Sequence, residues 1–107
     1  MKKMLLMVLL LAACLVHAEI LIPMDMTQSN HLKAYGIAFQ ALKEQYVVKW
    51  LLNYRGGSFL FPDVEAVVSQ CNIRGVRYET INSAQVAAIM TEIQDSNMES
   101  IILEKEP

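Results

Sequence analysis

The sequence predicts an α/β protein with a three-layer, open parallel sheet of Rossmann-like or flavodoxin-like type, after an N-terminal signal peptide. The order of the expected elements favours this class. Short runs of branched and aromatic residues alternate along the chain with segments whose apolar residues recur at helical spacing. Strands that alternate with helices pair in parallel through right-handed crossovers, which places helices on both faces of the sheet. The expected order of elements is βαβαβαβ.

Residues 1–18 have the pattern of a secretory signal peptide. Two lysines precede an unbroken apolar run over residues 4–16, which is shorter than the roughly 20 residues that cross a bilayer. Val16 and Ala18 stand where a signal peptidase reads small residues, so the mature chain is expected to begin at Glu19. We therefore expect an exported protein, periplasmic or extracellular, with one α/β domain over residues 19–107 and no transmembrane span.

The two cysteines have different expected roles. Cys14 ends a Leu-Ala-Ala-Cys stretch that resembles a lipoprotein box, so the alternative localisation is a lipoprotein anchored through Cys14. Cys71 lies on an apolar stripe with Val64, Val67 and Val68, at the i, i+3, i+4, i+7 spacing of a helix. This position predicts a buried core residue, and a single cysteine in the mature chain predicts no internal disulfide.

The first strand, helix and second strand are expected within residues 20–52. Residues 20–24 and 46–52 are apolar runs of strand length. The helix between them is expected to begin after Ser29 or Asn30 and to end near Glu44. Its expected inner face comprises Leu32, Tyr35, Gly36, Phe39 and Leu42. The glycine on that face predicts a close approach of the helix to the sheet.

Two more helices and two more strands are expected after residue 60. A helix opens at residues 62–63, ends near Asn72 and is stopped by Gly75, and a strand follows over residues 76–81. Asn82 and Gln85 have the spacing of a capping box for the last helix, and residues 99–104 form the last strand. The core stripe of that helix is expected to be Val86, Ile89, Met90 and Ile93. Phe59, Leu60 and Phe61 are interpreted as a packed or interface segment.

Charge and motifs exclude several function classes. The chain has a net charge of −2, and residues 19–107 alone carry seven basic and eleven acidic side chains, so nucleic acid is not an expected partner. The sequence contains no G-x-G-x-x-G, phosphate-binding G-K-[ST], H-E-x-x-H, C-x-x-C or G-x-S-x-G. The sequence therefore lacks the usual motifs of nicotinamide binding, nucleotide hydrolysis, zinc proteolysis, thioredoxin-like redox chemistry and serine hydrolysis. We expect neither a cofactor nor a metal.

Polar residues gather in the two loops that follow the first two expected strands. In an open parallel sheet, ligands bind beyond the carboxyl ends of the strands. Arg55 is expected to pair with an anion, and the glycine N–H groups of the same loop add donors. The expected ligand-binding residues are Asp25, Gln28, Asn30, His31, Asn53, Arg55, Gly56 and Gly57. Each also has a structural interpretation, with Asp25 capping a turn and Arg55 held in a salt bridge.

Three runs of sequence resemble a known family. Residues 20–25 (ILIPMD), 30–38 (NHLKAYGIA) and 50–60 (WLLNYRGGSFL) are similar to the start of exported bacterial proteins labelled asparagine synthetase B. The resemblance covers most of residues 19–104 and implies a longer protein, because members continue with further α/β segments. This chain would then be the N-terminal lobe.

The family label implies an amidotransferase or ligase, whose motifs differ from this sequence. A glutamine-hydrolysing asparagine synthetase uses an N-terminal cysteine nucleophile and an S-G-G-x-D-S loop for ATP. The expected mature chain begins with Glu19, and the Arg-Gly-Gly-Ser stretch at residues 55–58 shares only the glycine pair with that loop. The catalytic motifs are therefore absent from this part.

Three functions remain open at this point. The leading expectation is an exported lobe that binds a small polar or carboxylated ligand at the two loops. The alternative is a fragment of an amidotransferase-like or hydrolase-like enzyme whose catalytic residues lie beyond residue 107. The third is an interaction module that packs against further domains of a longer chain or against another chain.

Overall fold

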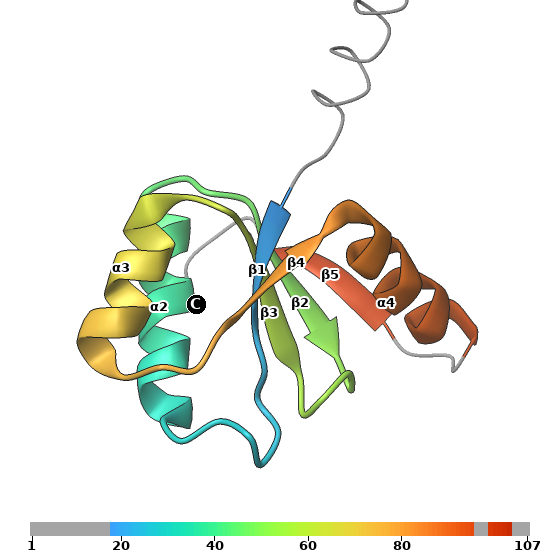
Figure 1. Ribbon diagram of the computed structural model, residues 1–107, viewed down its shortest axis with the longest axis horizontal. Coiled ribbons are helices and arrows are strands. Elements are labelled where there is room, and N and C mark those ends of the chain that lie inside the picture. The colour runs from blue at the N-terminus through green and yellow to red at the C-terminus, as the bar shows by residue number, and fades with distance from the viewer. Residues whose placement is uncertain (1–17, 96–98, 104–107) are drawn as a thin grey trace, which may run out of the picture.

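The computed structural model describes residues 18–95 and 99–103 (Figure 1). The residues before Ala18, which include Cys14 and nearly all of the expected signal peptide, lie outside this range. The elements in chain order are β1 (Ala18–Ile22), α2 (His31–Lys43), β2 (Val48–Leu52), β3 (Ser58–Pro62), α3 (Glu65–Arg74), β4 (Glu79–Asn82), α4 (Ser83–Asp95) and β5 (Glu99–Leu103).

The sheet has the strand order β4-β1-β3-β2-β5, and every neighbouring pair is antiparallel. The expected parallel sheet of Rossmann-like or flavodoxin-like type is therefore wrong. The part from β1 to β4 has the split βαβ connectivity of ferredoxin-like folds. The helix α4 and the strand β5 are added to it, with β5 next to β2.

One strand accounts for the difference. The segment of Phe59, Leu60 and Phe61 is the centre of β3, which forms a hairpin with β2 and pairs with β1 on its other side. A hairpin reverses the chain, so β3 runs against both β1 and β2 and separates them. The βαβαβαβ order expected from the sequence has no strand at residues 58–62 and therefore no hairpin. With that strand left out, a helix lies between every two successive strands, which is the arrangement of a parallel sheet.

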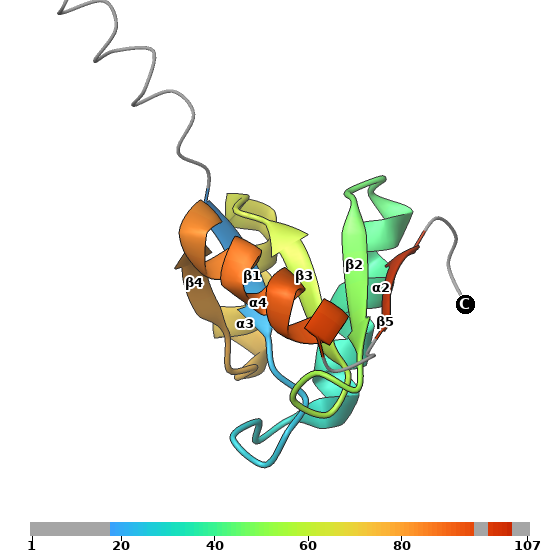
Figure 2. The same ribbon diagram turned by 90° about the vertical axis from the view of Figure 1, so that its right-hand side faces the viewer.

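Helices cover both faces of the sheet. Figure 1 shows α2 and α3 on one side and α4 on the other, and Figure 2 shows α4 crossing the sheet from the β4 side toward β5. Alternation along β1 sends Ile20 and Ile22 into the core under α2 and α3, and Leu21 into the core under α4. None of the helices that the structure describes is long and apolar enough to cross a membrane.

The inner face of α2 differs from the expected one. The residues that face the core are Ala34, Ile37, Ala38 and Ala41, whereas Leu32 is 84% exposed and Tyr35 is 51% exposed. Small residues let the helix lie close to the sheet, and the large ones extend past its margin. Gly36 does not mark a close approach, because the nearest atom to a Cβ built there is Arg74 Nη1 at 3.9 Å.

Two helix boundaries follow local signals as expected, whereas α3 begins at Glu65 and not at residues 62–63, because Pro62 still belongs to β3. Gly75 ends α3 in the left-handed conformation, with φ of 68°. At the start of α4, the Asn82 N–H donates to Gln85 Oε1 and the Gln85 N–H donates to Asn82 Oδ1, both at 2.8 Å. Cys71 is fully buried in the core between α3 and the sheet, as its spacing predicted.

Candidate functional site

The two polar loops meet at one end of the sheet, which is the lower end in Figure 1. The loop after β1 and the β2–β3 turn are joined by the Met24 N–H, which donates to the Arg55 carbonyl at 3.1 Å. The Ser58 hydroxyl donates to the same carbonyl at 3.2 Å. The two loops are thus fixed to each other through the backbone before their side chains interact.

Gly56 makes this contact possible. Its φ is +81°, and a Cβ built on it would lie 2.4 Å from the Met24 carbonyl oxygen. Glycine adopts such a φ without the steric cost that side chains incur. The close approach of the two loops therefore requires glycine at position 56.

Arg55 is held by three side chains of the protein itself. Its Nε donates to Asp25 Oδ2 at 2.8 Å, and its Nη1 donates to Glu79 Oε2 at 2.8 Å. Its Nη2 donates to Thr27 Oγ1 at 3.1 Å. The guanidinium thereby joins the β1–α2 loop, the β2–β3 turn and the start of β4. We call Asp25, Thr27, Arg55 and Glu79 the loop lock.

The pKa of Asp25 is strongly lowered. Hydrogen bonds from Thr27 and from Arg55 lower its pKa from 3.8 to about 2. The hydrogen bond to Asp25, together with that to Glu79, raises the pKa of Arg55 above its already high value, so the guanidinium stays charged. Asp25 and Arg55 are thus both charged throughout the neutral pH range.

The loop lock predicts an acid-dependent loss of stability. Because the pKa of Asp25 is lower in the folded than in the unfolded chain, its contribution is present above about pH 4 and is lost as the pH falls toward about 2. Asp25→Asn should therefore be less stable than the wild type at pH 7, with the difference shrinking between pH 4 and pH 2. Chemical unfolding at a series of pH values measures both curves.

The matched control for this prediction is Asp95→Asn, which changes an exposed acid at the end of α4. Its stability curve should stay parallel to that of the wild type. A curve for Asp25→Asn that also stays parallel across the acid range would contradict the stabilising role of the ionised Asp25.

The buried side chain of Gln28 holds the β1–α2 loop in place. It is 4% exposed, and its Nε2 donates to the carbonyls of Pro23 and Arg77 at 2.9 Å each. Its Oε1 accepts from the Arg77 N–H at 2.9 Å. In the part of the chain that the structure describes, no buried side-chain nitrogen or oxygen lacks a partner. Gln28 thus has its hydrogen-bonding groups engaged within the protein.

The remaining residues predicted to bind a ligand occupy separate places. His31 Nε2 lies 3.0 Å from the carbonyl oxygens of Met24 and Asp25, beside the loop lock. Asn30 precedes α2, and its Nδ2 donates to the Arg74 carbonyl at 3.3 Å. Asn53 lies exposed in the β2–β3 turn at a φ of 65°. Gly57 accepts a hydrogen bond from Trp50 Nε1 at 3.0 Å through its carbonyl.

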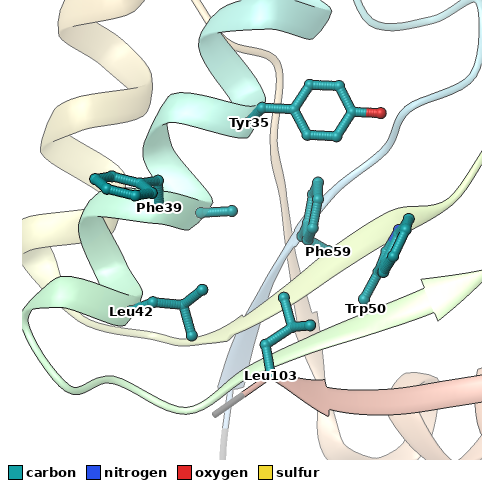
Figure 3. A pocket seen from close by; sticks show the side chains of 7 residues that line it. Tyr35, Phe39, Leu42, Trp50, Phe59 and Leu103 are labelled. Atoms are coloured by element: carbon teal, nitrogen blue, oxygen red, sulfur yellow. The ribbon is translucent and has the colours of Figure 1, made fainter. Parts of the chain in front are cut away.

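An apolar groove lies on another part of the molecule, between α2 and the strands β2, β3 and β5. It has a volume of about 250 Å³ and is lined by Tyr35, Ala38, Phe39, Leu42, Trp50, Phe59 and Leu103 (Figure 3). We call it the aromatic groove. Phe59 and Trp50 are stacked with ring centroids 6.1 Å apart, and Tyr35 meets Phe59 edge-on at 5.7 Å.

Sequence reasoning missed two parts of these sites. Glu79 completes the loop lock from 24 residues away, and only the antiparallel pairing of β4 with β1 places it there. The aromatic groove was missed because Tyr35 and Phe39 were assigned to the core face of α2. The expected packed segment at residues 59–61 was a partial signal, since Phe59 lies in the floor of the groove.

Two kinds of chemistry have little support in the described residues. Burial raises the pKa of the Cys71 thiol to about 11, so it is neither accessible nor ionised at neutral pH. Residues 18–95 and 99–103 contain no group of three His, Cys, Asp or Glu side chains placed to hold a metal ion.

The chain was compared with families, curated proteins and solved structures. No family model, no curated protein and no solved structure matches it.

Proposed function

We propose that this chain is an interaction lobe of a longer exported protein, and that its aromatic groove packs against a further domain of the same polypeptide. The observation that carries this proposal is the groove itself, whose floor and walls are aromatic and aliphatic. An apolar hollow bordered by large exposed apolar side chains is typical of a surface that a partner covers.

The exposed stripe of α2 extends the groove along the helix. Leu32, Tyr35 and Phe39 have the spacing of one helix face and are 84%, 51% and 39% exposed. On the sheet side, Ile101 pairs with Trp50 and is 41% exposed. The apolar surface thus continues from the helix across the groove to the edge strand β5. Covering it would remove several large side chains from water.

The resemblance to proteins labelled asparagine synthetase B supports the choice of partner. Its members carry further α/β segments after the part that resembles this chain, so a domain able to cover the groove would belong to the same polypeptide. The three runs that carry the resemblance fall on β1 and its loop, on α2, and on β2 and β3. These elements contribute Asp25 and Arg55 to the loop lock and line much of the groove.

A small carboxylated ligand at the two loops is the weaker candidate. Asp25 and Glu79 already balance the charge of Arg55, and each nitrogen of its guanidinium donates one hydrogen bond within the protein. The enzyme alternative places its nucleophile beyond residue 107, because burial keeps Cys71 out of reach. Both alternatives are compatible with a lobe whose groove packs against another domain.

A photo-crosslinking amino acid placed at position 39 tests the proposal. The protein would be produced from its complete gene and purified from the cell envelope, irradiated, and digested for mass spectrometry. Phe39 lines the groove and is 39% exposed, so its replacement should leave the fold intact. The expected product joins position 39 to a peptide of the same polypeptide beyond residue 107.

Position 73 provides the matched control. Ile73 is 73% exposed on α3, and it is not among the residues that line the groove. It should give no such product. A crosslink from position 39 only to a second copy, or none at all, would overturn the proposed partner.

A further inference from the structure

A second hollow lies on the opposite face of the sheet, under α4. It has a volume of about 310 Å³ and is lined by Leu21, Tyr54, Glu79, Ile81, Gln85, Ala88, Ile89 and Glu92. The floor is apolar, because Leu21, Ile81 and Ile89 are buried members of the core beneath α4. We call it the α4 hollow. Its volume is at the small end of the range for ligand pockets.

The rim of the α4 hollow is acidic. Glu79 belongs to β4 and lies directly across from Leu21 of β1, so both side chains point to the α4 face. Glu92 reaches the rim from α4. Both ion pairs of the described residues use Arg55, so the carboxylate of Glu92 has no cationic partner there.

Most of the charged groups around Tyr54 are acidic. Glu92, Glu79 and Asp25 act on its phenol electrostatically, and Arg55 is the cation that opposes them. Of these groups, Glu79 and Glu92 line the hollow, and Glu79 is paired with Arg55, so Glu92 is the rim charge without a cationic partner among the described residues. Burial, followed by the charge of Glu92, raises the pKa of Tyr54, in keeping with a phenol placed between core and carboxylates.

We propose that the α4 hollow binds a small organic ammonium ion, with the apolar part of the ligand over Leu21, Ile81 and Ile89 and its cationic group between Glu79, Glu92 and the Tyr54 ring. A cation gains from carboxylates and from the face of an aromatic ring at once. An anion is repelled by the same groups, and a purely apolar molecule gains nothing from the carboxylate of Glu92. The site is independent of the aromatic groove, which lies on the other face.

Three probes of one shape test the charge requirement. 2-Phenylethylamine is a cation at pH 7, 2-phenylethanol is its neutral counterpart, and phenylacetate is an anion. Titration of the ¹⁵N-labelled chain, followed by amide shifts, locates and measures binding. We expect 2-phenylethylamine to shift Tyr54, Ala88 and Ile89, with a Kd about tenfold lower than that of the alcohol. The acid should shift none of the three.

Glu92→Gln removes one rim charge from an exposed position and should weaken binding of the amine about fivefold while leaving the alcohol unchanged. Glu65→Gln removes an exposed charge on α3, across the sheet, and should change neither Kd. Equal binding of amine and alcohol, unchanged binding by Glu92→Gln, or no shifts at all would each overturn the proposal.

Discussion

Replacement of Gly56 by alanine is expected to lower the free energy of unfolding by about 3 kcal/mol, the largest loss of any exchange of a turn glycine in this chain. Two effects add. A φ of +81° disfavours any residue with a Cβ, and the new Cβ would lie 2.4 Å from the Met24 carbonyl oxygen and 2.7 Å from its carbon. Both atoms belong to the backbone and cannot rotate away, so the two loops must separate.

Gly75→Ala separates the two effects. Gly75 also has a positive φ, of +68°, but nothing lies within 4 Å of a Cβ built there. Only the conformational cost remains, so a loss of about 1 kcal/mol is expected. Urea unfolding of the two variants and the wild type measures the difference. Equal losses for both variants would show that the contact between the loops does not need glycine at position 56.

Local signals in the sequence predict two of the helix boundaries well. The reciprocal hydrogen bonds of Asn82 and Gln85 and the left-handed Gly75 depend on neighbours within a few residues, and the structure confirms both. The end of one helix and the start of another can therefore be placed from sequence. The pairing of strands depends on residues far apart and cannot be placed in this way.

The sheet topology could be predicted only if β3 was recognised as a strand. Ser58 to Pro62 is a strand of five residues that is buried on both faces, so its side chains show no alternation of polar and apolar residues. A short continuous apolar run of this kind resembles any packed segment. Once it is counted as a strand, the two glycines before it indicate a hairpin turn, and an antiparallel sheet follows.

The buried face of α2 illustrates a different limit. The sequence offers two apolar stripes, one of large residues and one of small ones, and size favoured the stripe with Leu32, Tyr35 and Phe39. The structure packs Ala34, Ala38 and Ala41 on the sheet. Periodicity locates an apolar stripe on a helix. Choosing between two adjacent stripes requires knowing which surface packs against the helix. The exposed stripe is the one that the proposed function uses.

The position of the polar cluster could be predicted, but not what its members do. Asp25, His31, Arg55 and Gly56 do come together where their loops meet. Their partners are mostly other groups of the protein, and Glu79 and the backbone of Arg77 are remote in sequence. A dense set of polar residues in loops thus predicts a junction as readily as a binding site.

Gln28 provides the second large effect expected at this junction. Gln28→Met keeps the length of the side chain but removes all of its hydrogen bonds, leaving the Pro23 carbonyl and both backbone groups of Arg77 without that partner. Loss of three bonds at a side chain that is 4% exposed should cost about 2 to 3 kcal/mol. Urea unfolding measures this loss, and hydrogen exchange at the Arg77 amide should become faster.

Gln94→Met is the control that distinguishes the loss of the Gln28 hydrogen bonds from a general effect of methionine. Gln94 is exposed on α4, so its replacement should change the free energy of unfolding by less than about 0.5 kcal/mol. If Gln28→Met changes the free energy of unfolding equally little and leaves the hydrogen exchange of the Arg77 amide unchanged, Gln28 does not hold the first loop in place. A loss with faster exchange at Arg77 means that Gln28 joins the first loop to the start of β4. Glu79 of the loop lock then owes its position partly to a glutamine that the sequence had suggested as a ligand-binding residue.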